Sequence, residues 1–126
     1  MLVTGELKLR ICASFADPES MKILEATFEV PKTKSTLEPE LGIPQSTIYR
    51  KIAALRECGL LMIDSYAIRP DGKREAAYIC TFREIRFKAE GGELQLEVIE
   101  SRRSAERRWF ELFSGGSERE LDKTEF

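Results

Sequence analysis

Six polar side chains between residues 45 and 51 carry hydrogen-bonding chemistry that suits the grooves of a nucleic-acid duplex. Gln45 can form a pair of hydrogen bonds with adenine, and Arg50 can do the same with guanine. The hydroxyl groups beside them suit phosphate oxygens or base edges. The candidate DNA-binding residues of this segment are therefore Gln45, Ser46, Thr47, Tyr49, Arg50 and Lys51. Tyr49 also fits a partly buried packing residue, so its role stays open here.

A second basic group, Arg69, Lys73 and Arg74, surrounds a Pro-Asp-Gly turn. Side chains of this kind bind the DNA backbone or minor groove, although they also serve solubility alone. Residues 45–74 hold six Lys and Arg against three Asp and Glu, whereas the whole chain has 20 and 22 and a net charge of −2. A uniformly basic nucleic-acid binder is excluded, and the positive charge is concentrated on the candidate segment.

Several classes of enzyme and metal site are excluded by composition. The chain contains no histidine, so it can build neither a Ser-His-Asp triad nor a His-ligated metal site. Its three cysteines, Cys12, Cys58 and Cys80, form no C-x-x-C pair. No Gly-rich phosphate loop or defensible carboxylate pair is present. We expect no enzymatic activity, cofactor or metal, and reduced structural thiols.

The N-terminus and the hydropathy pattern bear on where the protein resides. The first residues lack the basic region and apolar run of a signal peptide. No apolar stretch approaches the ~20 residues that a membrane span needs. We expect a cytoplasmic protein without a membrane partner.

The candidate residues are expected to lie on the last of three helices. Asp17 and Pro18 predict the start of the first helix, and Ser35 with Glu38 predicts a capping box at the start of the second. Gly42 is expected to end that second helix in a left-handed conformation. The predicted helices span residues 18–27, 36–41 and 44–58.

Two of these helices are separated only by residues 42–44, which is typical of a helix-turn-helix over residues 35–59. In the third helix, Ile48, Ile52 and Leu55 recur on one face, which we expect to be buried. Ser46, Tyr49, Arg50 and Ala53 fall on the opposite face.

Two hairpins are predicted after Gly59. In the first, a wing over residues 61–82, an Asp71–Lys73 loop would pair Ile68 with Ala76, Tyr66 with Tyr78 and Met62 with Phe82. In the second, over residues 84–99, a Gly91-Gly92 turn pairs Ala89 with Leu94, Phe87 with Leu96, Ile85 with Val98 and Arg86 with Glu97. Residues 6–15 fit a strand or a helix equally well.

A final helix over residues 104–113, capped by Ser104, carries an apolar cluster of Trp109, Phe110, Leu112 and Phe113. The cluster could cover the domain's own core or meet a second subunit. We favour a homodimer interface, because palindromic half-sites need a two-fold partner. The four arginines at the start of this helix could contact a DNA flank or an acidic partner surface, and a solvated face fits them equally well. Residues 114–126 are expected to be disordered.

These elements predict an α+β fold: a winged helix-turn-helix with an added second hairpin and a C-terminal helix, in one domain over residues 1–113. Residues 16–24 (ADPESMKIL), 40–52 (ELGIPQSTIYRKI) and 54–61 (ALRECGLL) resemble the ArsR-like winged-helix regulators of archaea and bacteria. The resemblance implies DNA binding. It does not extend to metal sensing, because this chain lacks the Cys and His ligands that metal-sensing members use.

The predicted function is that of a sequence-specific transcription regulator of double-stranded DNA. The recognition helix, residues 44–58, would enter the major groove, and the wing tip, residues 69–74, would lie on the backbone or minor groove. The alternative is a winged-helix module for protein–protein contact in a transcription or processing assembly. The low pI of about 5.4 and the acidic flanks favour that alternative.

Overall fold

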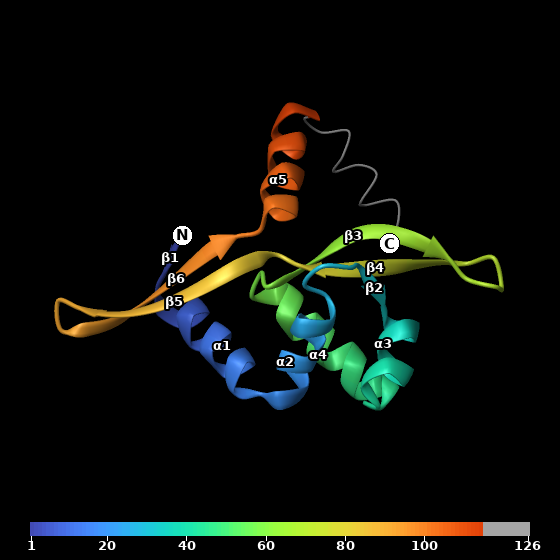
Figure 1. Ribbon diagram of the computed structural model, residues 1–126, viewed down its shortest axis with the longest axis horizontal. Coiled ribbons are helices and arrows are strands. Elements are labelled where there is room, and N and C mark those ends of the chain that lie inside the picture. The colour runs from blue at the N-terminus through green and yellow to red at the C-terminus, as the bar shows by residue number, and fades with distance from the viewer. Residues whose placement is uncertain (115–126) are drawn as a thin grey trace.

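The chain folds into helices and antiparallel sheets, as the predicted α+β class requires (Figure 1). The structure, a computed structural model, describes residues 1–114. In this part of the chain the helices are α1 (Gly5–Ala16), α2 (Pro18–Ala26), α3 (Lys34–Leu41), α4 (Gln45–Glu57) and α5 (Arg102–Ser114). The strands are β1 (Leu2–Val3), β2 (Lys32–Thr33), β3 (Leu61–Ile68), β4 (Arg74–Cys80), β5 (Phe82–Glu90) and β6 (Glu93–Glu100).

The six strands of residues 1–114 form two three-stranded antiparallel sheets, ordered β1-β6-β5 and β2-β4-β3. Helices α1 to α4 cover one side of the sheets, and α5 rises from the other side (Figure 1). Ile48, Ile52 and Leu55 are fully buried, which confirms the predicted inward face of α4. They share one core with Leu96 of β6 and Cys80 of β4, so both sheets pack on the same helices.

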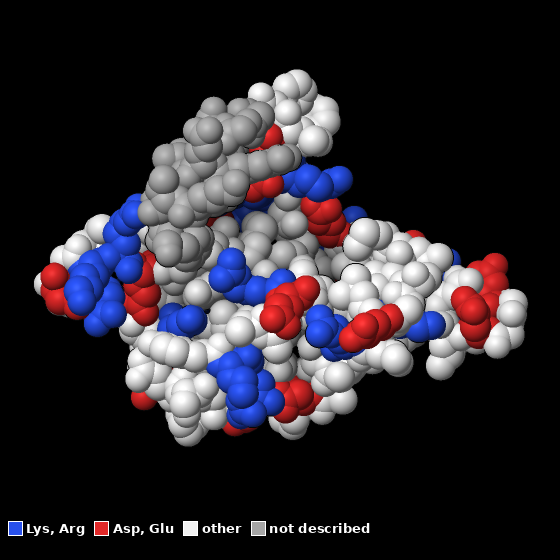
Figure 2. All heavy atoms as spheres, turned by 180° about the vertical axis from the view of Figure 1, so that it is seen from behind, with Lys and Arg blue, Asp and Glu red and all other residues white. Residues whose placement is uncertain are grey.

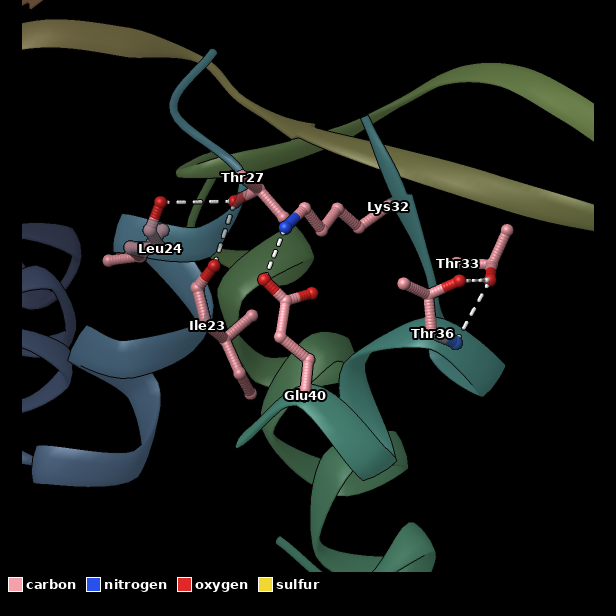
Figure 3. Close-up of polar contacts among 7 residues, drawn as sticks. All are labelled: Ile23, Leu24, Thr27, Lys32, Thr33, Thr36 and Glu40. Atoms are coloured by element: carbon pink, nitrogen blue, oxygen red, sulfur yellow. Dashed lines mark hydrogen bonds and ion pairs between the residues drawn. The ribbon is translucent and has the colours of Figure 1, made fainter. Parts of the chain in front are cut away.

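The first two helices follow from local signals and from packing. Residues 6–15, which fit a strand or a helix by sequence, lie in helix α1, where Ile11 is buried. The rings of Phe15 and Phe82 pack edge to face there, with their centroids 5.7 Å apart. The predicted cap of α2 is confirmed, because the Asp17 carboxylate accepts a hydrogen bond from the Ser20 N–H at 3.0 Å. At its end, Thr27 Oγ1 donates to the carbonyl of Ile23 at 2.9 Å (Figure 3).

Helix α3 begins earlier than the capping box predicted. Its N-cap is Thr33, whose side-chain oxygen accepts from the Thr36 N–H at 3.2 Å, and Ser35 lies inside the helix (Figure 3). The prediction of a Ser35 cap was wrong because Lys32 and Thr33 pair with β4 as strand β2, so the chain leaves the sheet at Thr33. An ion pair from Lys32 to Glu40 ties β2 to α3.

The turn between α3 and α4 is confirmed. Gly42 follows α3 with φ of +68°, a conformation that glycine adopts without a Cβ clash. Helix α4 then begins at Gln45 and ends at Glu57, within a residue of the predicted bounds.

The β3–β4 hairpin has the predicted loop length but a different register. The observed loop is Pro70–Gly72, closed by the Arg69 N–H donating to the Lys73 carbonyl at 2.8 Å. Ile68 therefore lies opposite Arg74, Tyr66 opposite Ala76 and Met62 opposite Ile79, so the predicted pairs were wrong. Two physical features cause the difference. Gly72, at φ of +84°, closes the loop one residue early, and a bulge at Asp64 shifts the strand alternation.

The β5–β6 hairpin has the predicted register in full, including Ala89 opposite Leu94 and Arg86 opposite Glu97. Helix α5 begins at Arg102 rather than Ser104, and its cap is Ser101, whose Oγ accepts from the Ser104 N–H at 3.1 Å. The predicted disordered tail lies outside the described residues, apart from the backbone of Ser114. Within residues 1–114, every helix is too short or too polar to span a bilayer.

Candidate nucleic-acid interface

The predicted site residues of α4 lie on different sides of the helix. With ~3.6 residues per turn and Ile48 facing the core, Ser46 and Arg50 point away from the core. Gln45, Tyr49 and Arg56 line the flank that faces β4 and α3, as the proximity of Arg56 to the Tyr78 ring indicates. Lys51 lies on the other flank, toward α2.

Tyr49 is an organised part of the α4 surface. Its hydroxyl accepts a hydrogen bond from Gln45 Nε2 at 2.6 Å, and the Lys34 ammonium lies 4.3 Å from the centre of its ring. A cation over an aromatic face is attracted to the ring's negative face. Tyr49 remains exposed, although Gln45 contacts its hydroxyl and Lys34 contacts its ring. No pattern in the sequence singles out Lys34, because it belongs to another helix and meets Tyr49 only in the fold.

Lys51 is held by a carboxylate of the same chain. Its ammonium lies 2.8 Å from Asp17 Oδ2, the same oxygen that accepts from Ser20 Oγ at 2.6 Å. The hydrogen bond from Lys51 and then those from Ser20 lower the pKa of Asp17 from 3.8 to about 2. Lys51 therefore joins α4 to the start of α2, whereas Arg50 projects on its own.

This pairing predicts how acid affects stability. We expect Asp17→Ala to lower the free energy of unfolding by about 1–2 kcal/mol at pH 7, because α2 loses its cap and Lys51 its partner. The folded pKa of Asp17, about 2, lies below the unfolded value of 3.8, so its contribution is complete above 3.8 and disappears as pH falls toward 2. Urea unfolding at several pH values measures the difference between the two proteins. Glu29→Ala, an exposed carboxylate on the following loop, is the control. A difference that persists unchanged at pH 2 would contradict the assignment.

The three predicted wing cations flank the β3–β4 loop, and they differ in the partners that they contact. Arg69 is paired with Asp71 at 3.3 Å, and the Arg74 guanidinium lies 5.3 Å from the centre of the Tyr66 ring. The exposed ammonium of Lys73 has no hydrogen-bond or ion-pair partner within residues 1–114. Figure 2 shows Lys and Arg gathered at the end of the molecule that carries this loop, and Asp and Glu at the opposite end, which carries the β5–β6 loop.

Arg50, like Lys73, lacks an ion-pair partner within residues 1–114. Its side chain is exposed, and no carboxylate of the described chain pairs with it. An unpaired exposed cation keeps its donors available for a ligand, and the guanidinium presents them in a planar fork. Two candidate cations without an ion pair in the described chain thus lie on the outward face of α4 and beside the β3–β4 loop.

The apolar cluster of α5 lies outside the core. Trp109, Phe110, Leu112 and Phe113 are 63%, 57%, 70% and 72% exposed. The helix is attached through the face that carries Arg103 and Arg107, where Arg103 lies 3.3 Å from Asp64 Oδ1 and Arg107 donates to the Asp64 carbonyl. That carbonyl belongs to the β3 bulge. All four side chains of the cluster therefore remain largely uncovered by the described part of the chain.

The thiols are free and mostly buried. Cys58 and Cys80 are buried and Cys12 is half-buried. Burial raises the pKa of the Cys80 thiol to about 11, so it stays protonated at neutral pH. Within residues 1–114 no three His, Cys, Asp or Glu side chains gather in a way that could hold a metal ion.

A scan against protein-family models finds no match, and no curated protein matches the sequence.

Proposed function

We propose that the protein is a sequence-specific double-stranded-DNA-binding transcription regulator of the cytoplasm. Helices α3 and α4 act as a helix-turn-helix, and the β3–β4 hairpin acts as the wing. In this proposal α4 enters the major groove, where Arg50 contacts base edges, and the wing tip lies on the backbone or minor groove. The resemblance to ArsR-like regulators supports the same assignment.

One observation carries the proposal: Arg50, on the outward face of α4, and Lys73, beside the loop of the hairpin that follows α4, lack ion-pair partners within residues 1–114. A duplex bound across both elements gives each cation a phosphate or base partner that its own subunit lacks. The short turn at Gly42 supports the proposal further, because it holds α3 against α4 in the way that a helix-turn-helix requires.

We also propose that the regulator is a homodimer joined through α5. Ala105, Trp109 and Leu112 recur at the spacing of a coiled-coil seam, on the face opposite Arg103 and Arg107. Trp109 and Leu112 of this stripe are exposed on a helix whose opposite face is anchored to the rest of the chain, which favours a second copy as the partner. Two-fold pairing would present two α4 helices to two half-sites.

A protein–protein interaction module is the second candidate. It is favoured by Phe87 and Leu94, which are 58% and 66% exposed on one face of the β5–β6 hairpin, at the acidic end of the molecule. Exposed apolar residues beside charged ones are typical of protein-binding surfaces. Such a module would not require duplex DNA.

Binding to random-sequence duplex DNA over a salt series separates the two candidates. The regulator should bind at about 50 mM KCl, and the logarithm of its affinity should fall linearly with the logarithm of the salt concentration. Selection from a random pool should enrich a site with two related halves. A protein that ignores duplex DNA at low salt would overturn the proposal and leave the interaction module.

A further inference from the structure

A cluster of two cations and two tyrosine rings lies where α3, α4 and β4 meet. Lys34, the first residue of α3, lies 4.3 Å from the centre of the Tyr49 ring and 5.8 Å from that of Tyr78. The Arg56 guanidinium, from the end of α4, lies 5.8 Å from the Tyr78 ring. We call these four residues, Lys34, Tyr49, Arg56 and Tyr78, the junction cluster.

The positive charge of the junction cluster is incompletely balanced. Neither Lys34 nor Arg56 forms an ion pair with a carboxylate of residues 1–114. Glu75 of β4 lies near enough to act on Lys34, but its Oε1 accepts hydrogen bonds from the Ser35 N–H, at 3.0 Å, and from the Ser35 hydroxyl. The Glu75 carboxylate that acts on Lys34 is thus already held by Ser35, and Arg56 adds a second positive charge near Lys34.

Lys34 bears an energetic cost in this position. Burial and then repulsion from Arg56 lower the pKa of Lys34 below its usual value of 10.5. A half-buried ammonium that lacks an ion pair has lost hydration without gaining a full counter-charge. An anion that approached Lys34 would restore that balance. The Tyr49 and Tyr78 rings orient the Lys34 ammonium, but they do not neutralise its charge.

We propose that the junction cluster is a phosphate-binding site for the DNA backbone, with Lys34 and Arg56 as its cations and Glu75 as a built-in opposing charge. The site lies on the flank of α4 that carries Gln45 and Tyr49 and faces the β3–β4 sheet. It therefore places a phosphate between the groove-reading helix and the wing. A phosphodiester there contacts the same duplex without reading its sequence. This inference rests on the proposed function, since it assigns the ligand as a DNA phosphate.

Salt-dependent duplex binding by the full chain tests the role of Lys34. Lys34→Met should weaken binding about equally for all sequences and reduce the slope against salt by about 0.9, the change expected for one lost phosphate contact. Lys34→Arg should retain the slope. Glu75→Gln should tighten binding, because it removes the opposing charge. Lys88→Met, an exposed lysine of β5, is the matched control, and a thermal melt of each variant confirms that it folds.

The results also separate this inference from the proposed function. If the wild-type protein binds duplex DNA but Lys34→Met has the slope of Lys88→Met, the phosphate site is wrong and DNA binding stands. A titration of the 15N-labelled protein with inorganic pyrophosphate needs no DNA. Amide shifts confined to the junction cluster and its neighbours, and lost in Lys34→Met, support the site even if DNA binding fails. Shifts that are absent or scattered over the surface overturn it.

Discussion

Replacing Arg50 by alanine is expected to relax base preference at one position of each half-site, at a cost of ~1–3 kcal/mol on the preferred sequence. The expectation follows from the exposed, unpaired guanidinium on the outward face of α4, which can form a bidentate contact with guanine. The melting temperature should change little, because Arg50 has no partner within the described chain. Competition binding with duplexes that vary one base pair at a time measures the effect.

Lys73→Ala provides the contrast. Lys73 lies in the wing loop and lacks a partner within residues 1–114, so its loss should weaken binding to every sequence about equally and reduce the salt slope. Arg83→Ala, which removes an exposed arginine at the start of β5, is the control for charge alone. If Arg50→Ala and Lys73→Ala behave alike, the division between a base-reading helix and a backbone-binding wing is wrong.

Introducing a charge at Trp109 is expected to separate the proposed dimer into folded monomers. Trp109→Glu places a carboxylate in the apolar stripe of α5, whose burial at an interface would otherwise stabilise association by ~1.5–3 kcal/mol per large side chain. Binding to a duplex with two half-sites should then weaken by about 100-fold or more, because the second contact is no longer intramolecular. Analytical ultracentrifugation and duplex binding measure the two effects.

Phe110→Glu is the matched control for this experiment. Phe110 is also exposed on α5, but it lies on the side nearer Arg103, away from the stripe of Ala105, Trp109 and Leu112. It should leave the dimer largely intact, although the whole aromatic cluster was predicted from sequence to form the interface. A wild-type protein that sediments as a monomer would contradict the dimer, as would a Trp109→Glu protein that remains dimeric.

Features that depend on neighbours along the chain could be predicted from the sequence alone. The Asp17 cap, the left-handed Gly42, the buried face of α4 and the Gly91-Gly92 turn were all predictable. Each depends on the backbone freedom or hydrogen bonding of a few adjacent residues, or on a single apolar period. The candidate residues of α4 and of the wing loop followed from these elements.

Other features depend on packing between distant segments, because the local signals in the sequence favour two structures about equally. Residues 6–15 form a helix because the buried Ile11 and the Phe15 ring pack beneath the sheets, although their apolar spacing fits a strand as well. The start of α3 moved to Thr33 because β2 pairs with β4, and the bulge at Asp64 set the β3–β4 register.

The fold also determines which cations have partners within the chain and which remain available for a ligand. Lys51 is held by Asp17, Lys34 lies over Tyr49, and Arg50 remains unpaired, although all three carry the same charge. Charge is a property of the residue, but its availability depends on which groups the fold brings within a few ångströms. Those partners come from other helices and strands, at sequence distances over which no local pattern can be read.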